Sequence, residues 1–171
     1  MSAQDHFPQE SQSGDDARLV KINFPLPEED HAHGVEAENL WANPLSDGGY
    51  RIENTPFYAY GVSFQDIVAA EEYGGKLVYR GVESRSGHST YRILIQNPEG
   101  YKDPTFKVAW VPLADLGCTF EVAKSRWLAI DVPALTDVFA VYALLEEGER
   151  SGLWTFEEGH CGHSLVGASK Q

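Results

Sequence analysis

The short segment from Arg85 to Thr90 gathers residue types that could bind an anion or carry out chemistry. It runs Arg-Ser-Gly-His-Ser-Thr and leads into the alternating apolar residues of a strand that contains Arg92. A turn built around a glycine can aim backbone N–H groups at one point, and nearby guanidinium and hydroxyl groups add donors for a carboxylate or a phosphate. We therefore take Arg85, His88, Ser89, Thr90 and Arg92 as candidate ligand-binding residues.

The neighbouring pair His88 and Ser89 raises the question of a serine nucleophile and its base. Adjacent residues of a strand point to opposite faces, so His88 is badly placed to activate Ser89. The sequence contains no Gly-x-Ser-x-Gly elbow and no phosphate-binding glycine loop of the Walker or dinucleotide type. The segment could equally be a junction between two folding units, where Gly87 supplies a backbone conformation that other residues resist. We favour the junction and predict no catalytic residue.

A second candidate is the segment Asn54-Thr55-Pro56-Phe57. Pro56 fixes an extended turn and Asn54 is a turn former, so the segment is first of all a bend between strands. If a ligand pocket lies at the junction, Asn54, Phe57 and Tyr58 are its candidate wall residues.

Histidine and cysteine near the C-terminus form the third candidate. His160, Cys161 and His163 are possible zinc ligands, but no second Cys/His pair follows at finger spacing. His31 and His33 lie apart, in an acidic loop. Solvated segments explain these residues more simply, so we predict no metal site and no cofactor.

Acidic residues dominate the charge of the chain. The formal net charge is −13, and residues 1–38 hold nine acidic and two basic residues. Such a chain repels nucleic acid and anionic membranes unless a local basic patch overrides the field, and the sequence suggests no such patch. A basic protein is the natural partner.

Several of these carboxylates stand at an unfavourable place. Glu146, Glu147 and Glu149 crowd the end of a predicted helix, where the helix dipole disfavours negative charge, and Glu157 and Glu158 follow closely. One interpretation is a solubilising face. The other is an acidic docking patch for a basic protein, which would speed association and aid selectivity.

Length and composition set the broad class. The 171 residues, 42% of them hydrophobic, suffice for one domain or two small ones. The sequence has no apolar run of membrane-spanning length and no secretory signal pattern, so we expect cytoplasmic residence. Cys118 and Cys161 form no disulfide framework and are expected to be reduced thiols. Residues 1–17 have the composition of a disordered tail.

The first half of the chain has the pattern of a small all-β unit. Leu19–Leu26 alternates as a strand, and Pro27–Glu38 is a polar loop. The runs ENLWANPL and YRIENTPFYA flank the hairpin signal Asp47-Gly48-Gly49, and FQDIVAAEEY and KLVYRGVES flank Gly74-Gly75. Five short strands with tight turns and no helix predict an SH3-like β-barrel over residues 18–86.

The second half alternates strands with two helices. STYRILIQ is a strand, and Asp103-Pro104 starts a helix that ends at Gly117 and that Pro112 should kink or shorten. CTFEVAK and RWLAIDV form a hairpin. A second helix starts at Thr136 or Asp137 and ends near Gly148 or Gly152, and LWTFEEG is the last strand. The order β-α-β-β-α-β predicts a ferredoxin-like sandwich over residues 87–159, followed by a flexible tail over residues 160–171.

Taken together, these segments resemble a bacterial family of unknown function, the one numbered 4265. The resemblance rests on LWANPLSDGGYRIENTPFYAYGVS, DIVAAEE, RSGHSTYRILI, LGCTFE, WLAIDVP and LLEEGERSGLWTFEEG. It spans roughly residues 18–159 and implies a bacterial protein of this α+β layout. It carries over no catalytic roles. Pro112 departs from the pattern expected of the family.

The sequence therefore predicts a protein that works by binding rather than by chemistry. The expected partner is a basic protein, and an immunity or antitoxin-like role is the sharpest version. The alternative is a small-molecule sensor or enzyme that holds an anionic ligand near Arg85–Ser89. A purely structural module is the third class. Nucleic acid and membrane are not expected partners, and the sequence does not fix the oligomeric state.

Overall fold

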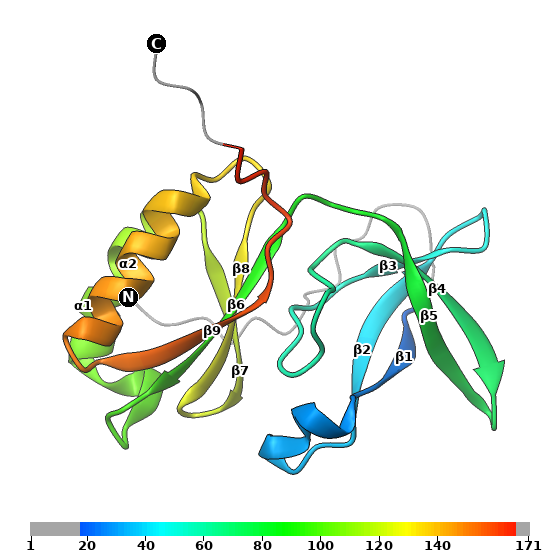
Figure 1. The fold of residues 1–171 in the computed structure, drawn as a ribbon, viewed down its shortest axis with the longest axis horizontal. Coiled ribbons are helices and arrows are strands. Elements are labelled where there is room, and N and C mark those ends of the chain that lie inside the picture. Colours follow the sequence, from blue (N-terminus) through cyan, green and yellow to red (C-terminus); the bar gives the residue numbers. More distant parts are fainter. Residues whose placement is uncertain (1–17, 167–171) are drawn as a thin grey trace.

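The computed structural model describes residues 18–166, so the tail predicted over residues 1–17, and residues 167–171 of the tail predicted over 160–171, lie outside the described residues. The described elements fall into a strand-built half and a mixed half (Figure 1). The first half comprises β1 (Val20–Pro25), the 3-10 helix η1 (Glu28–His33), β2 (Ala37–Pro44), β3 (Tyr50–Ile52), β4 (Ile67–Tyr73) and β5 (Lys76–Ser84). The second comprises β6 (Ser89–Ile95), the 3-10 helix η2 (Gly100–Lys102), α1 (Pro104–Asp115), β7 (Thr119–Lys124), β8 (Trp127–Val132), α2 (Val138–Arg150) and β9 (Trp154–His160).

Strands β1 to β5 close into a barrel in chain order. Each strand is antiparallel to the next, and β1 meets β5 in parallel. Alternate residues of β1 and β2, such as Ile22 and Leu40, are fully buried inside the barrel with Ile52 and Val68. The period-2 pattern in the sequence is therefore the inward and outward alternation of barrel strands.

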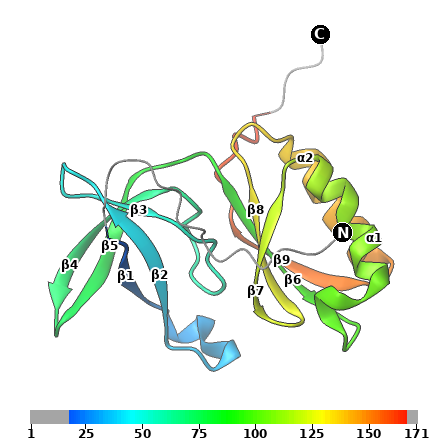
Figure 2. The same cartoon turned by 180° about the vertical axis from the view of Figure 1, so that it is seen from behind.

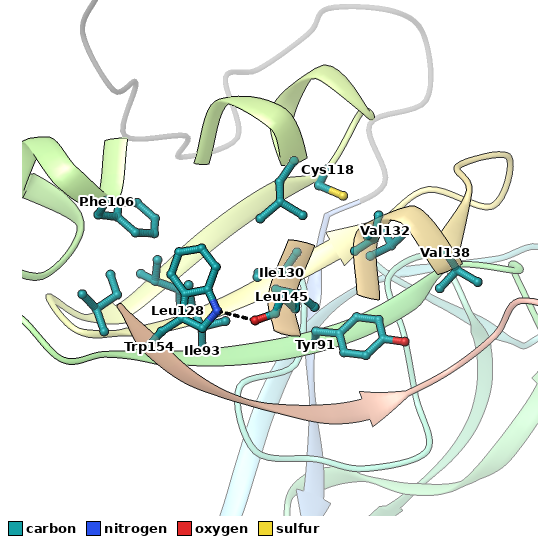
Figure 3. Close-up of a cluster of buried hydrophobic side chains, with 13 residues drawn as sticks. Tyr91, Ile93, Phe106, Cys118, Leu128, Ile130, Val132, Val138, Leu145 and Trp154 are labelled. Carbon is teal, nitrogen blue, oxygen red and sulfur yellow. Dashed lines mark hydrogen bonds between the residues drawn. The ribbon is translucent and has the colours of Figure 1, made fainter. Parts of the chain in front are cut away.

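Strands β6 to β9 form an antiparallel sheet in the order β7-β8-β6-β9. Helices α1 and α2 lie on one face of this sheet, on the side away from the barrel (Figures 1 and 2). An apolar core fills the space between helices and sheet, with the ring of Trp154 at its centre (Figure 3). The indole Nε1 of Trp154 donates to the carbonyl of Leu145 at 3.0 Å, so its polar atom is satisfied inside that core.

Helix α1 follows its predicted boundaries. It begins after Asp103, and Cys118 N–H donates to Leu113 O at 3.1 Å beyond Gly117, which closes the end of the helix. Pro112 lies inside the helix, yet the helix still reaches Asp115. The residue four positions earlier, Val108, is exposed, so water can satisfy the carbonyl that loses its hydrogen bond.

Helix α2 has the predicted cap. The side chain of Asp137 accepts the N–H groups of Phe139 and Ala140 at 3.0 and 3.2 Å. The helix ends at Arg150, so the later of the two expected stops is the right one. Position 148, inside the helix, is a glycine because a Cβ atom there would stand 2.1 Å from the ring of Trp154.

Some predicted elements differ from the structure. The predicted strand FQDIVAAEEY begins only at Ile67, and His160, predicted as the first residue of the C-terminal tail, is the last residue of β9. YRIENTPFYA is a strand only over Tyr50–Ile52, and residues 53–66 form a long irregular connection, here called the junction loop. The polar loop predicted over Pro27–Glu38 contains η1, and its last two residues belong to β2. The junction loop departs from a strand because its backbone groups bond to side chains of both halves, as described below.

The fold class is therefore α+β, with a closed five-stranded barrel and a second sheet that carries two helices. Within residues 18–166, neither helix combines the length and apolarity that a membrane crossing needs. The face of the second sheet that the helices leave free is turned toward the barrel and the junction loop (Figure 2).

Candidate functional site

The predicted segment Arg85–Thr90 lies where the barrel meets the second sheet. Nη1 of Arg85 donates to the carbonyl of Gly61 at 2.7 Å and to Oδ2 of Asp66 at 3.1 Å. Asp66 is buried, and its Oδ1 also accepts the N–H of Ser86 at 2.8 Å. The Arg85 charge is thus paired with an internal carboxylate that the sequence analysis did not single out.

His88 is bonded to a carboxylate rather than to a nucleophile. Its Nδ1 lies 2.8 Å from Oδ1 of Asp131, and its ring packs edge-on against Phe64 at 5.5 Å between ring centroids. Burial raises the pKa of Asp131, and the hydrogen bond and charge of His88 oppose that rise. Gly87 has a φ of 87°, which confirms that the turn needs a conformation that glycine adopts readily.

The hydroxyl groups of Ser89 and Thr90 are engaged inside the protein. Ser89 is fully buried; its Oγ accepts the N–H of Gly162 at 2.9 Å and lies 2.6 Å from Nδ1 of His163. Nε2 of His163 in turn lies 2.9 Å from the carbonyl of Pro133, so the tautomer protonated at Nε2 satisfies both contacts. Thr90 donates to Ser63 at 2.8 Å. The Ser89 and His163 pair fastens the chain after β9 and offers no accessible nucleophile.

Arg92 is the most deeply buried charge of the predicted set, with no exposed side-chain surface. Its Nη1 donates to the carbonyl of Ala59 at 3.1 Å, and its guanidinium carbon lies 4.4 Å from the centroid of the Tyr60 ring. Nε is 2.9 Å from Oε1 of Glu157, an ion pair whose angle is not that of a hydrogen bond. Among the described residues Nη2 has no hydrogen-bond partner. The guanidinium therefore holds the junction loop against the sheet.

The opposite side of the junction loop is held by Glu38 of β2. Its carboxylate accepts the N–H groups of Phe57, Tyr58 and Ala59 at 2.7, 2.8 and 2.7 Å. Phe57 and Tyr58, the predicted wall residues, thus contribute their backbone to a structural contact. Asn54 accepts the N–H of Trp41 at 2.8 Å. The loop lies between a carboxylate of the barrel and a guanidinium of the sheet.

Glu121 of β7 is a second carboxylate that faces the loop. Its Oε2 accepts the N–H of Thr55 at 3.1 Å. Burial raises the pKa of Glu121 to about 7, with a smaller contribution from the charges of Asp131 and Glu38. In the strand register, Glu121 of β7 lies opposite Ala129 of β8, and Ala129 lies opposite Arg92 of β6. On its other side, Arg92 lies opposite Glu157 of β9. One row of the free face therefore carries two carboxylates and the buried guanidinium.

The residues that sequence reasoning missed here are acidic: Glu38, Asp66, Glu121 and Asp131. Glu121 and Asp131 had a usable signal, because each interrupts an apolar strand run. Glu38 had none, since its partners are backbone N–H groups about 20 residues along the chain, and the pairing of Asp66 with Arg85 and Ser86 is equally distant in sequence.

The predicted partner-binding carboxylates lie around the end of α2 and along β9. Glu147 pairs with Arg150, and Glu149 accepts the N–H of Phe156 at 3.2 Å. Glu157 pairs with Arg92, and Glu158 accepts the Tyr91 hydroxyl at 3.2 Å. Glu146, Glu147 and Glu149 thus lie around the end of α2, and Glu158 lies on the same side of the sheet, whereas Glu157 points to the barrel side; four of the five have internal partners.

Two exposed aromatic residues extend this acidic region along α2. Phe139 and Tyr142 are 57% and 41% exposed, and they share a helix face with Glu146 and Glu149. The Tyr142 ring packs edge-on against Phe156 of β9 at 5.4 Å between centroids. We call Phe139, Tyr142, Glu146 and Glu149 the α2 stripe.

Of the histidine and cysteine residues, Cys161 and His163 both contact Ser89, and His31 lies in the other half. His160 is the last residue of β9, and Sγ of Cys161 lies 3.7 Å from Oγ of Ser89. Nε2 of His31 lies 2.8 Å from the carbonyl of Leu26 in the other half. In the described part of the chain, no three histidine, cysteine or acidic side chains form a group that could hold a metal ion.

Comparison with known proteins gives a family and a fold. A family model described as a domain of unknown function, DUF4265, matches residues 38–156. A solved structure with the same fold is described as a hypothetical protein from Neisseria gonorrhoeae; it has a TM-score of 0.69 and 17% sequence identity, over 89% of this chain and 100% of that chain. Among curated proteins there is no match.

Proposed function

Since the chain belongs to the DUF4265 family, whose description states no activity, we propose a function from its own residues: it is a non-enzymatic module that binds a basic protein partner. The α2 stripe carries this proposal. It sets two exposed aromatic rings in line with two exposed carboxylates on one helix face.

The chemistry of the α2 stripe suits arginine and lysine side chains of a partner. Carboxylates attract such cations over a distance and steer association, and aromatic faces bind them by cation–π contact. Exposed aromatic residues are also the side chains that dominate the binding energy of protein interfaces. Glu158 and Phe156 of β9 flank the stripe and would widen the contact.

The sharpest form of the proposal is an immunity or antitoxin-like role in the cytoplasm. In that role the stripe would cover the basic surface of a toxin. The formal net charge of −13 supports a basic partner, because it disfavours nucleic acid and anionic membranes on most of the surface.

We also propose two domains with the boundaries expected from the sequence, 18–86 and 87–159. An SH3-like assignment for the first is supported by the five-stranded barrel, and a ferredoxin-like assignment for the second by the strand order β7-β8-β6-β9 with two helices on one face. The separate apolar cores of the two halves support the boundary at Gly87.

The alternative, an anionic ligand held near Arg85–Ser89, has less support. Arg85, His88 and Ser89 each bond to groups of the protein itself. A ligand would have to displace those bonds and leave Asp66 or Asp131 buried without its partner side chain, which is costly.

The test is the association kinetics of a partner captured from the native host. Changing Glu146, Glu147 and Glu149 to glutamine should lower the on-rate about tenfold and flatten its salt dependence. Each glutamine keeps a carbonyl oxygen, so the contact of Glu149 with Phe156 can persist.

A matched control removes three exposed charges elsewhere, through Glu72→Gln, Glu99→Gln and Asp115→Asn. Equal effects of the two triple variants would show that association depends only on the overall charge of the protein. Unchanged kinetics in both variants would exclude the α2 stripe as the binding site. Adding Tyr142→Ala to the first variant should raise the off-rate.

A further inference from the structure

The barrel closes at a seam between its first and fifth strands. Five strands joined in chain order must alternate in direction, so the first and the fifth run the same way and can meet only in parallel. Parallel pairing is slightly less stable per residue than antiparallel pairing. Here it covers two residue pairs, Ile22 with Leu77 and Asn23 with Val78.

An open groove follows this seam on the outer surface of the barrel. Alternate residues of the two strands line it, together with the turn of the β4–β5 hairpin. The lining residues are Asn23 and Pro25 of β1, Lys76, Val78 and Arg80 of β5, and Tyr73 and Gly74 of the hairpin. Within the described chain this lining contains two basic residues and no acidic one, in a protein whose formal net charge is −13.

The cations at the groove are available to a partner. Lys76 is exposed and has no ion pair among the described residues. Nε of Arg80 pairs with exposed Glu71 at 3.0 Å, a surface pair that contributes little and that leaves the terminal nitrogens free to bond. A third cation, Lys21, lies on the outer face of β1, 4.7 Å from the centroid of the half-exposed Trp41 ring.

Apolar surface accompanies this charge. The ring of Tyr73 is 74% exposed at the hairpin turn, and Val78 and Pro25 lie beside the cations. Along β5 the groove therefore presents basic, apolar and basic side chains at every second residue, about 7 Å apart. This is the spacing of side chains on one face of an extended peptide.

We propose that this seam groove binds an extended acidic peptide segment of a partner protein, with the pattern acidic-x-apolar-x-acidic. The two acidic side chains pair with Lys76 and Arg80, and the apolar side chain between them packs on Val78 and Pro25. Tyr73 covers one end of the bound segment.

The groove is distinct from the α2 stripe. It has the opposite charge, and helix α2 and hairpin β4–β5 lie at opposite ends of the molecule (Figures 1 and 2). The proposal therefore does not rest on the function proposed above, and a variant of one surface leaves the other intact.

The test uses the whole chain, isotope-labelled, and a synthetic peptide, Ser-Glu-Thr-Val-Thr-Glu-Ser, followed by NMR amide shifts. Shifts should be confined to β1, β5 and the hairpin turn. The double variant Lys76→Glu with Arg80→Glu should weaken binding at least tenfold, and a peptide with glutamine in place of glutamate should bind equally weakly.

The matched control is Lys102→Glu with Lys107→Glu, which changes the net charge equally on the other half. Equal weakening by this control, shifts centred on α2, or no shifts at millimolar peptide would each overturn the proposal. Tighter binding of a thymidine decanucleotide to the same residues would assign the groove to nucleic acid instead. Should the double variant not fold, Tyr73→Ala must weaken peptide binding at least threefold.

Discussion

The two faces of the β7-β8-β6-β9 sheet are packed in opposite ways. On the helix side, Ile93, Leu128, Leu145 and Trp154 form a core of apolar side chains (Figure 3). On the barrel side, the same strands present charged and polar groups that bond to the junction loop, with Arg92 at the centre.

The difference shows what each face contributes. Apolar burial is non-directional and roughly proportional to area, so it stabilises the helices on the sheet and tolerates small shifts. Hydrogen bonds and ion pairs depend on distance and angle, and an unmet partner is costly. The barrel face therefore fixes one placement of the two halves, and the predictions below separate this role from simple stabilisation.

The largest expected effect is at Arg92. Replacing Arg92 with alanine leaves Glu157 and the loop carbonyls without their cation, and we expect the free energy of unfolding to fall by about 3–5 kcal/mol. Hydrogen exchange should accelerate in the junction loop. Denaturant unfolding of the variant measures the loss, with Arg51→Ala, from a partly exposed ion pair, as the control. A loss below about 1 kcal/mol, the value of a surface pair, would refute this role.

A cavity on the helix side should act locally. Leu145→Ala removes a fully buried side chain, and we expect a loss of about 3 kcal/mol. Because Leu145 belongs to the core between helices and sheet, amide exchange should rise in α2 and β9 and stay unchanged in the barrel strands β1 and β2. Faster exchange in the barrel as well would mean that both faces serve one cooperative unit.

The smallest effect concerns pH. Burial raises the pKa of Glu121 to about 7 from the usual 4.5, so the fold favours its neutral form. The stability that this form contributes is complete below pH 4.5 and is lost as pH rises through 7. Relative to the wild type, Glu121→Gln should therefore be about 1–2 kcal/mol more stable at pH 8 than at pH 5, by denaturant unfolding. An equal difference at both pH values would show that Glu121 is ionised throughout.

Local signals in the sequence predicted much of the fold. The glycine pairs after Asp47 and Tyr73 mark the two barrel hairpins, and Asp137 caps α2, because turn and cap chemistry depends on residues close in sequence. The extent of β3 was not predictable in the same way. Asn54 and Pro56 indicated a bend within residues 53–66, but groups distant in sequence determine the path of the rest.

The candidate site was also predictable only where the signal is local in sequence. The sequence pointed to Arg85, His88 and Arg92 as polar groups at a junction, and the structure places them there. Their partners Asp66 and Asp131 lie 19 and 43 residues away from the groups they pair with. A single sequence contains no signal that pairs such positions, so the internal hydrogen bonds of these side chains could not be predicted.

The junction loop also restricts how its own length can change. The Glu38 carboxylate accepts hydrogen bonds from the N–H groups of three consecutive residues, Phe57 to Ala59, and Arg92 donates to the carbonyl of Ala59. Inserting or deleting one residue between Pro56 and Tyr60 would move at least one of these N–H groups, or the Ala59 carbonyl, away from its buried charged partner. Surface loops usually tolerate such changes of length, but we expect the junction loop not to tolerate them. Relatives that have both Glu38 and Arg92 should have the same number of residues in this loop.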